Sequence, residues 1–252
     1  MNNFDFTGKK VLIAGGSGGM GSALVAAFLA RGAKVIVTSR ANELFSSSDV
    51  SEFASNSNFC LIKIDLLNRN EISSLHDKVQ LEVGDIDILI LAQGMVEPSS
   101  ALNLSPESWD RQIQINVTAT FRLAQIFAPE MIKIGYGKII TFSSMLTFQG
   151  GLNASAYAAS KGAVGQLTKA LSNEWAPFGV NVNSIAPGYI KTSLNQHIWK
   201  DEDRNKSILG RLTSGRWGVP NDIVGPTLFL SSPESDYIHG TILPVDGGWL
   251  SR

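Results

Sequence analysis

A tyrosine and a lysine stand four residues apart in a segment of otherwise small side chains. Tyr157 and Lys161 belong to the stretch SAYAASKGAV, residues 155–164. Residues at positions i and i+4 are neighbours on a helix surface, so the phenol and the ammonium group would lie on one face. A nearby cation favours the ionised phenol, which makes the tyrosine a better proton donor and acceptor near neutral pH. The same spacing also arises in solvated surface pairs, so other residues must show whether this pair is catalytic or simply exposed.

A glycine-rich turn near the start of the chain predicts a dinucleotide site. The segment AGGSGGMG (14–21) follows an apolar run and precedes a helix-like stretch. Its glycines let the backbone turn tightly and approach a pyrophosphate, whose charge is stabilised at a helix N-terminus. This strand–turn–helix context is more specific than glycines alone. The contacts expected here are Gly15, Ser17, Gly19, Met20 and Gly21.

The end of the next apolar run, residues 34–39, bears on the choice of cofactor. An acidic residue there would bind both adenosine ribose hydroxyls and favour NAD. The sequence has Ser39 and Arg40 at this point. A hydroxyl and a guanidinium suit a 2′-phosphate, because arginine donates several hydrogen bonds in a fixed fork. We expect NADP to be preferred, with NAD possible, although Arg40 could also be a surface residue. Asp65, after the third run, is expected at the adenine amino group.

Apolar runs that alternate with helix-like segments must position these groups. Short, β-branched, near-continuous apolar strands are typical of a parallel sheet buried on both faces. We expect one α/β domain over residues 1–252, a Rossmann-type doubly wound sheet of about seven parallel strands with helices on both faces. The expected strands are 10–15, 34–39, 59–65, 86–92, 138–144, 180–186 and 241–247, and the expected helices are 20–31, 69–82, 106–134, 155–176 and 221–231.

Two segments do not fit this alternation. Residues 41–58 are rich in Ser and Asn, which predicts a surface loop with at most a short helix. Residues 188–215 mix charged and aromatic side chains between the sixth strand and the last helix. A long insertion at that end of the sheet indicates a lid over a ligand.

The composition limits the classes of partner. Of 252 residues, 44% are hydrophobic and 17% charged, and the formal net charge is −1. This charge argues against nucleic acid or an anionic membrane surface as the main partner. The single cysteine, Cys60, excludes an internal disulfide and fits a reducing compartment, and the start has no apolar signal segment. We expect a cytoplasmic protein that binds a small molecule, and we predict no metal site.

The glycine turn, the Tyr-x-x-x-Lys pair and DGG near the C-terminus together resemble the short-chain dehydrogenase/reductase family over essentially the whole chain. The resemblance implies a catalytic set of Asn116, Ser144, Tyr157 and Lys161. It assigns proton transfer to Tyr157 and a hydrogen bond to the substrate oxygen to Ser144. Lys161 would hold the nicotinamide ribose, and Asn116 would anchor a water that relays protons. Further implied cofactor contacts are Leu66, Gly94, Pro187, Gly188, Ile190 and Thr192.

The second half is more closely similar to the 2-deoxy-D-gluconate 3-dehydrogenase / 2-dehydro-3-deoxy-D-gluconate 5-dehydrogenase subgroup. The similar stretches are SSMLTFQGG, NEWAPFGVNVNSIAPGYIKT, GRWGVP and VDGGWLSR. The similarity implies interconversion of a secondary alcohol and a ketone on a sugar acid or polyol. A substrate carboxylate could be bound by Arg211, Arg216 or His197, although the two arginines could equally be structural. The candidate substrate residues are Ser144, Met145, Gln149, Asn153, Tyr189 and Arg211, with Trp217 also near the pocket.

Two motifs depart from the family pattern. Ala14 stands where the family usually has threonine, and LAQG (91–94) replaces the usual NNAG. Only Gly94 is retained, so Leu91, Ala92 and Gln93 must support the sheet and the cofactor pocket differently. Neither departure changes a residue that transfers a proton. We therefore expect them to affect local stability and the geometry of the cofactor pocket more than the chemistry.

Other functions remain open from the sequence. One is a 3-oxoacyl-carrier-protein reductase or general ketone reductase of the same family, although no basic docking patch for a carrier protein is evident. An enoyl reductase is less favoured, because those members usually place tyrosine and lysine further apart. A non-catalytic NADP(H)-binding regulatory protein would typically lack a catalytic residue, whereas all four are present. The resemblance also implies a homotetramer built on the long helices.

Overall fold

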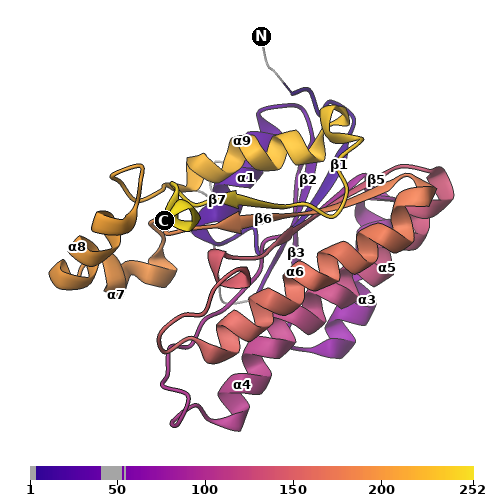
Figure 1. Cartoon of the computed structure of the whole chain (residues 1–252). Coiled ribbons are helices and arrows are strands. Elements are labelled where there is room, and N and C mark those ends of the chain that lie inside the picture. The colour runs from indigo at the N-terminus through magenta and orange to yellow at the C-terminus, as the bar shows by residue number, and fades with distance from the viewer. Residues whose placement is uncertain (1–3, 41–52, 54) are drawn as a thin grey trace.

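A parallel sheet forms the centre of the computed structural model, which describes residues 4–40, 53 and 55–252. In these residues seven strands run in the order β3-β2-β1-β4-β5-β6-β7 (Figure 1). The order reverses between β1 and β4, and such a switch point opens a crevice at the carboxyl ends of the strands. The strands are β1 Lys10–Ala14, β2 Lys34–Ser39, β3 Phe59–Lys63, β4 Ile88–Leu91, β5 Gly137–Phe142, β6 Val180–Pro187 and β7 Ile242–Val245.

Helices cover both faces of the sheet, which confirms the expected fold class (Figure 1). Successive strand residues point to opposite faces. Leu12 of β1 therefore packs in one core with helices α3, α5 and α6, whereas Ile13 packs in the other with α1 and α9. The helices that cover the sheet are α1 Gly19–Leu29, α3 Arg69–Val83, α5 Ala119–Ile134, α6 Ser155–Trp175 and α9 Pro220–Ser231, whereas α4 Pro106–Ile113 packs against α6.

The helical segment expected at 106–134 contains a turn of π-helix. Ser105 caps its start by accepting a hydrogen bond of 3.1 Å from the backbone N–H of Ser108, and Pro106 occupies the first turn. The π turn spans Gln114–Thr118 between α4 and α5, and the N–H of Ala119 bonds to the carbonyl of Gln114, five residues earlier. Asn116 lies in this turn, so the irregularity falls at a predicted functional residue.

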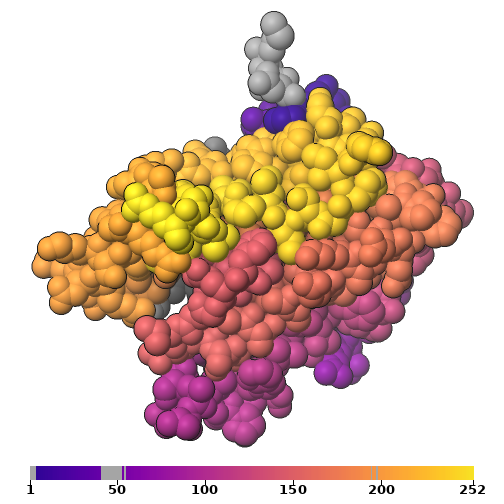
Figure 2. Space-filling model, viewed as in Figure 1, coloured from indigo at the N-terminus to yellow at the C-terminus, as the bar shows by residue number. Residues whose placement is uncertain are grey.

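Residues 188–215 contain short helices rather than a bare loop. α7 Gln196–Trp199 and α8 Glu202–Arg211 extend beyond the carboxyl end of the sheet (Figure 1). Figure 2 shows the surface hollowed between this orange segment and the red segment that precedes α6. Most of the segment expected as a loop at 41–58 lies outside the described residues. Within the described ranges, no helix combines the length and the apolar composition that a membrane span requires.

Candidate active site

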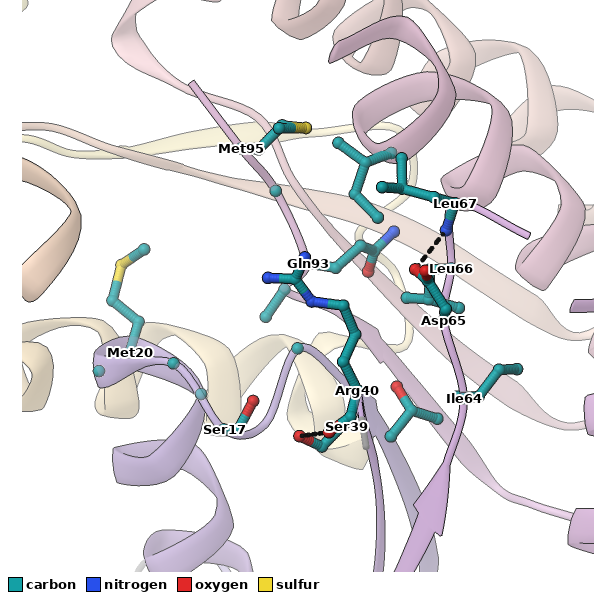
Figure 3. A pocket seen from close by; sticks show the side chains of 18 of the residues that line it. Ser17, Met20, Ser39, Arg40, Ile64, Asp65, Leu66, Leu67, Gln93 and Met95 are labelled. Carbon is teal, nitrogen blue, oxygen red and sulfur yellow. Dashed lines mark hydrogen bonds between the residues drawn. The ribbon is translucent and has the colours of Figure 1, made fainter. Parts of the chain in front are cut away.

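A cavity of about 420 Å³ opens at the carboxyl ends of β1 to β4 (Figure 3). It lies at the switch point of the sheet, where ligands of such folds bind. Eleven of the predicted cofactor residues line it, namely Gly15, Ser17, Gly19, Met20, Gly21, Ser39, Arg40, Asp65, Leu66, Gly94 and Thr192. The remaining lining residues, not predicted as contacts, are Gly18, Thr38, Ile64, Leu67, Ala92, Gln93, Met95, Ile115 and Ser193.

The glycine turn forms one wall of the cavity and requires its glycines. Gly15 has a φ of +80°, and a Cβ there would lie 2.6 Å from the backbone nitrogen of Gln93. A Cβ at Gly21 would collide with the carbonyl oxygen of Gly15. The turn therefore packs directly on the end of β4 and leaves α1 to begin at the cavity, as a pyrophosphate site requires.

The opposite side of the cavity carries the groups expected to meet an adenosine moiety. Arg40 extends from the end of β2 into the space between the glycine turn and Asp65 (Figure 3). The Asp65 carboxylate accepts a 2.9 Å hydrogen bond from the N–H of Leu67, which fixes its orientation. The buried hydroxyl of Thr38, also in the wall, has no hydrogen-bond partner in the described part of the chain. The glycine cradle, the guanidinium and this hydroxyl fit a dinucleotide with a ribose phosphate.

Several predicted cofactor residues lie away from this cavity. Pro187 and Gly188 stand at the end of β6, and a Cβ at Gly188 would lie 2.6 Å from Cα of Asp246. Ile190 is buried in the core beside α9 and lines a second cavity of about 320 Å³, together with Tyr189. Thr192, from the same segment, does reach the first cavity. Of these four predicted cofactor residues, Thr192 therefore lines the first cavity and Ile190 lines the second, whereas Pro187 and Gly188 line neither.

Asn116 is held through nearly all of its polar groups. Its Oδ1 accepts a 2.9 Å hydrogen bond from the N–H of Met95, and its Nδ2 donates to the carbonyl of Met95 at 3.0 Å. Nδ2 also donates to Oγ of Ser160 at 2.9 Å. Ser160 donates to the carbonyl of Tyr157 at 2.7 Å, so hydrogen bonds connect Asn116 to the backbone of Tyr157.

Lys161 is buried beside Asn116 and Tyr157. Its Nζ lies 5.7 Å from the centroid of the Tyr157 ring. A Cβ on Gly94 would lie 3.3 Å from Oδ1 of Asn116 and 3.5 Å from Nζ of Lys161, so Gly94 lies against both residues. Burial lowers the pKa of Lys161 from 10.5 to about 8. The lysine can therefore exchange a proton at mildly alkaline pH.

Ser144 and Tyr157 meet as the family resemblance implies, but the expected pKa effect is wrong. Burial raises the pKa of the Tyr157 phenol, and hydrogen bonding to Ser144 opposes part of that rise. The rise occurs because desolvation disfavours the phenolate more than its surroundings favour it. Ser144 also caps a 3₁₀ turn, Met145–Thr147, by accepting a 3.2 Å hydrogen bond from the N–H of Leu146. The two alternatives for Ser144, an active-site group and a local cap, are thus compatible.

The candidate substrate residues gather beside the segment 188–215. Nη2 of Arg211 donates to Oε1 of Gln149 at 3.1 Å, and its guanidinium lies 4.0 Å from the centroid of a Trp249 ring. Tyr189 packs against the same tryptophan at 4.8 Å between ring centroids, and burial raises the pKa of its phenol. Met145 is buried in this cluster.

Three other candidates differ in their surroundings. Asn153 is exposed and has a φ of +54°, and its carbonyl accepts a 3.0 Å hydrogen bond from the N–H of Ser99. Arg216 forms two hydrogen bonds with Asp222, of 2.7 and 2.9 Å, so its charge is already paired. The side chain of His197 lies outside the described part of the chain.

The sequence does not reveal the residues that hold the candidate catalytic and substrate-binding groups in place. Met95 and Ser160 bind Asn116, and Trp249 packs on Arg211, through contacts that only the tertiary fold creates. Gln93, which departs from the family motif, is a further lining residue that the sequence analysis does not predict. Its size gave a usable signal, because an amide at a position that is usually alanine must reach a partner or the cavity.

The fold and the cavity define the chain as a dinucleotide-binding α/β protein, and comparisons with known proteins extend this. The family model described as Enoyl-(Acyl carrier protein) reductase matches residues 14–250. The chain is 40% identical over 253 residues to the 2-dehydro-3-deoxy-D-gluconate 5-dehydrogenase of Pseudoalteromonas atlantica, covering 100% of both chains. It is 38% identical to the enzyme of that name from Dickeya dadantii, covering 100% of this chain and 99% of the relative.

A solved structure supports the same family. The crystal structure of a gluconate 5-dehydrogenase from Burkholderia cenocepacia, in complex with NADP and tartrate, superposes with a TM-score of 0.93. That protein is 31% identical, and the match covers 100% of this chain and 98% of that chain. The chain belongs to the short-chain dehydrogenase/reductase family. It is an NAD(P)-dependent oxidoreductase that acts on CH–OH groups.

Proposed function

We propose that the chain interconverts a secondary alcohol and a ketone on a sugar acid, with Asn116, Ser144, Tyr157 and Lys161 as its catalytic residues. The observation that carries this proposal is the continuous hydrogen bonding from Asn116 through Ser160 to Tyr157, next to buried Lys161. The relatives named 2-dehydro-3-deoxy-D-gluconate 5-dehydrogenase support a keto-sugar acid as the substrate class.

In the direction of reduction, Tyr157 donates its phenolic proton to the carbonyl oxygen of the substrate. Burial raises its pKa, so the phenol is protonated and ready to donate. Ser144 hydrogen-bonds the same oxygen and stabilises the charge that develops on it. The bound nicotinamide supplies the hydride. In the direction of oxidation, Tyr157 accepts the proton of the alcohol.

Lys161 replenishes the proton that Tyr157 gives up. A pKa of about 8 allows the ammonium group to release and regain a proton near physiological pH. Oδ1 of Asn116 accepts one hydrogen bond from Met95 and retains a second lone pair for a water molecule between Lys161 and solvent. This arrangement gives the proton a route that does not cross the substrate.

Arg211 binds the carboxylate of the substrate. Its recorded partners are the neutral side chains of Gln149 and Trp249, so the guanidinium retains donors and its charge for an anion. Gln149, Asn153 and Tyr189 offer polar groups for hydroxyls, and Met145 provides apolar contact. Residues 188–215, whose helix α8 ends at Arg211, act as a lid that brings this group to the substrate.

Ser39 and Arg40 select NADP over NAD in this proposal. Both line the cavity at the end of β2, where a ribose 2′-phosphate would lie, and no acidic residue stands at that point. Pro187, Gly188 and Ile190 support the nicotinamide end from the end of β6. The protein acts in the cytoplasm as a homotetramer, and the partly exposed apolar side chains of Trp109 on α4 and Phe121 on α5 supply contact area.

Initial rates with NADPH and NADH over a panel of keto-sugar acids, polyols and 3-oxoacyl thioesters test the proposal. We expect turnover of keto-sugar acids and a higher kcat/KM with NADPH. Activity restricted to acyl thioesters would instead support the carrier-protein reductase. Tight binding of NADPH without turnover of any substrate would support a regulatory protein.

A further inference from the structure

Gln93 connects the wall of the cofactor cavity to the helix that carries Asn116. It follows β4, lines the cavity and is only 6% exposed (Figure 3). Its Nε2 donates a 2.9 Å hydrogen bond to Oγ1 of Thr120. Thr120 is buried on α5 and donates from the same oxygen to the carbonyl of Asn116 at 2.8 Å. Two hydrogen bonds thus join Gln93 to the peptide group of Asn116.

The chemistry of the threonine fixes the direction of these bonds. A hydroxyl has one proton, and the carbonyl of Asn116 can only accept, so Thr120 must accept from the amide of Gln93. The nitrogen of that amide therefore faces Thr120. Its Oε1 is buried and has no hydrogen-bond partner among the described residues. A buried acceptor without a partner is costly, so the position of this amide is not explained by its own hydrogen bonding.

The peptide group of Asn116 lies where the regular hydrogen bonding of the helix is interrupted. The π turn Gln114–Thr118 shifts the backbone bonds by one residue, and such turns are rare and frequently lie at functional sites. Residues 93–95 bind this turn at two points. Gln93 acts on the carbonyl of Asn116 through Thr120, and the backbone of Met95 pairs with the Asn116 carboxamide.

We propose that Gln93, acting through Thr120, is a positioning residue that sets the orientation of Asn116 for proton transfer to Lys161. This inference rests on the proposed function, in which Asn116 holds the water between Lys161 and solvent. It also accounts for the glutamine in LAQG, because alanine at this position could not reach Thr120.

Variants of Thr120 test the inference without changing the lining of the cavity. Thr120→Val removes the hydroxyl at nearly constant shape, whereas Thr120→Ser retains it. Thr227→Val is the matched control, because Thr227 is also buried and donates to the carbonyl four residues earlier, that of Ile223, at 2.8 Å in α9. The measurements are kcat, its solvent deuterium isotope effect, the Kd for NADPH and the melting temperature.

We expect Thr120→Val to lower kcat by about three- to tenfold, the value of one hydrogen bond, and to increase the solvent isotope effect. Thr120→Ser should retain kcat and the isotope effect of the wild type, and the Kd for NADPH should stay within about twofold. Thr227→Val should lower the melting temperature and leave both kinetic values unchanged. Gln93→Leu should reproduce the loss in kcat. The kcat of the double variant Gln93→Leu/Thr120→Val should be no lower, because both changes break the same series of hydrogen bonds.

A wild-type kcat and isotope effect in Thr120→Val would overturn the inference, as would additive losses in the double variant. Asn116→Ala separates this outcome from failure of the proposed function. If Asn116→Ala loses activity while Thr120→Val does not, only the role of Gln93 is refuted. If Asn116→Ala itself retains the kcat of the wild type, the catalytic assignment of Asn116 is wrong.

Discussion

Lys161 and Phe142 are joined by a hydrogen bond of 2.6 Å, donated by Nζ on α6 to the carbonyl oxygen at the end of β5. The lysine is 4% exposed, and no ion pair is recorded for it in the described part of the chain. Its positive charge is therefore held by neutral groups. This explains why burial alone lowers the pKa of Lys161 to about 8.

This buried charge predicts a dependence of stability on pH. Between about pH 8 and 10.5 the unfolded chain binds more protons at Lys161 than the native chain, so this residue makes stability rise with pH across that window. Below pH 8 the native chain bears the full cost of burying the charged ammonium group of Lys161. Lys161→Met removes it, and we expect the free energy of unfolding at pH 7 to increase by about 1–3 kcal/mol.

Urea denaturation at pH 7, 8.5 and 10 measures this effect. Lys169→Met, on the exposed face of the same helix, should leave the pH dependence of the wild type in place. A Lys161→Met protein that is less stable than the wild type at pH 7 would contradict the predicted penalty. The same variant should lose activity, because the proton route then ends at Tyr157.

Tyr157→Phe tests the proton donor. We expect kcat to fall by about 100-fold or more, because general acid–base catalysis is worth that much, while the Kd for NADPH changes little. Fluorescence titration with NADPH and steady-state rates measure the two quantities. Tyr136→Phe is the control, since Tyr136 lies before β5, where Nζ of Lys9 is 4.0 Å from its ring centroid. Comparable rates for Tyr157→Phe and the wild type would rule out the assigned role.

Gly94→Ala tests how closely the end of β4 approaches the candidate catalytic groups. The added methyl group would lie 3.3 Å from Oδ1 of Asn116, which is a tight contact, and 3.5 Å from Nζ of Lys161, which is an ordinary contact. We expect kcat to fall by about 10- to 100-fold through displacement of the Asn116 carboxamide. Gly162→Ala on α6 meets nothing within 4 Å, so it should retain activity. Its stability should rise by about 0.5–1 kcal/mol, because alanine is the better helix former. Equal kcat values in the two variants would refute the predicted crowding.

Arg211→Ala tests recognition of the substrate carboxylate. We expect the KM for a keto-sugar acid to rise by about tenfold or more, since hydrogen bonds between charged groups are worth that much. The KM for an uncharged polyol and for NADPH should stay close to the wild-type values. Arg204→Ala, an exposed arginine on the same helix, is the matched control. An equal rise in KM for charged and uncharged substrates would indicate that Arg211 supports the lid instead.

The parts of the fold that depend on local sequence were predictable. The strands follow from short, near-continuous apolar runs rich in β-branched residues, the glycine turn follows from backbone freedom at Gly15, and both are confirmed. Contacts across the fold were not predictable. That Ser160 holds Asn116, or that Gln149 binds Arg211, depends on helices and loops brought together by the sheet. The raised pKa of Tyr157 also depends on burial, which the spacing of Tyr157 and Lys161 does not reveal.

The π turn at Gln114–Thr118 has a consequence for the rotational phase of the helix. Each residue of an α-helix advances the side chains by about 100°. A π turn accommodates one extra residue, so the side chains before and after it differ in phase by that amount. If the same residues formed a regular α-helix, this offset would be lost and α4 would turn by about 100° relative to α5. Asn116 could then no longer face Met95 while the core side chains of α5 kept their places, so the regular helix would be the inactive one.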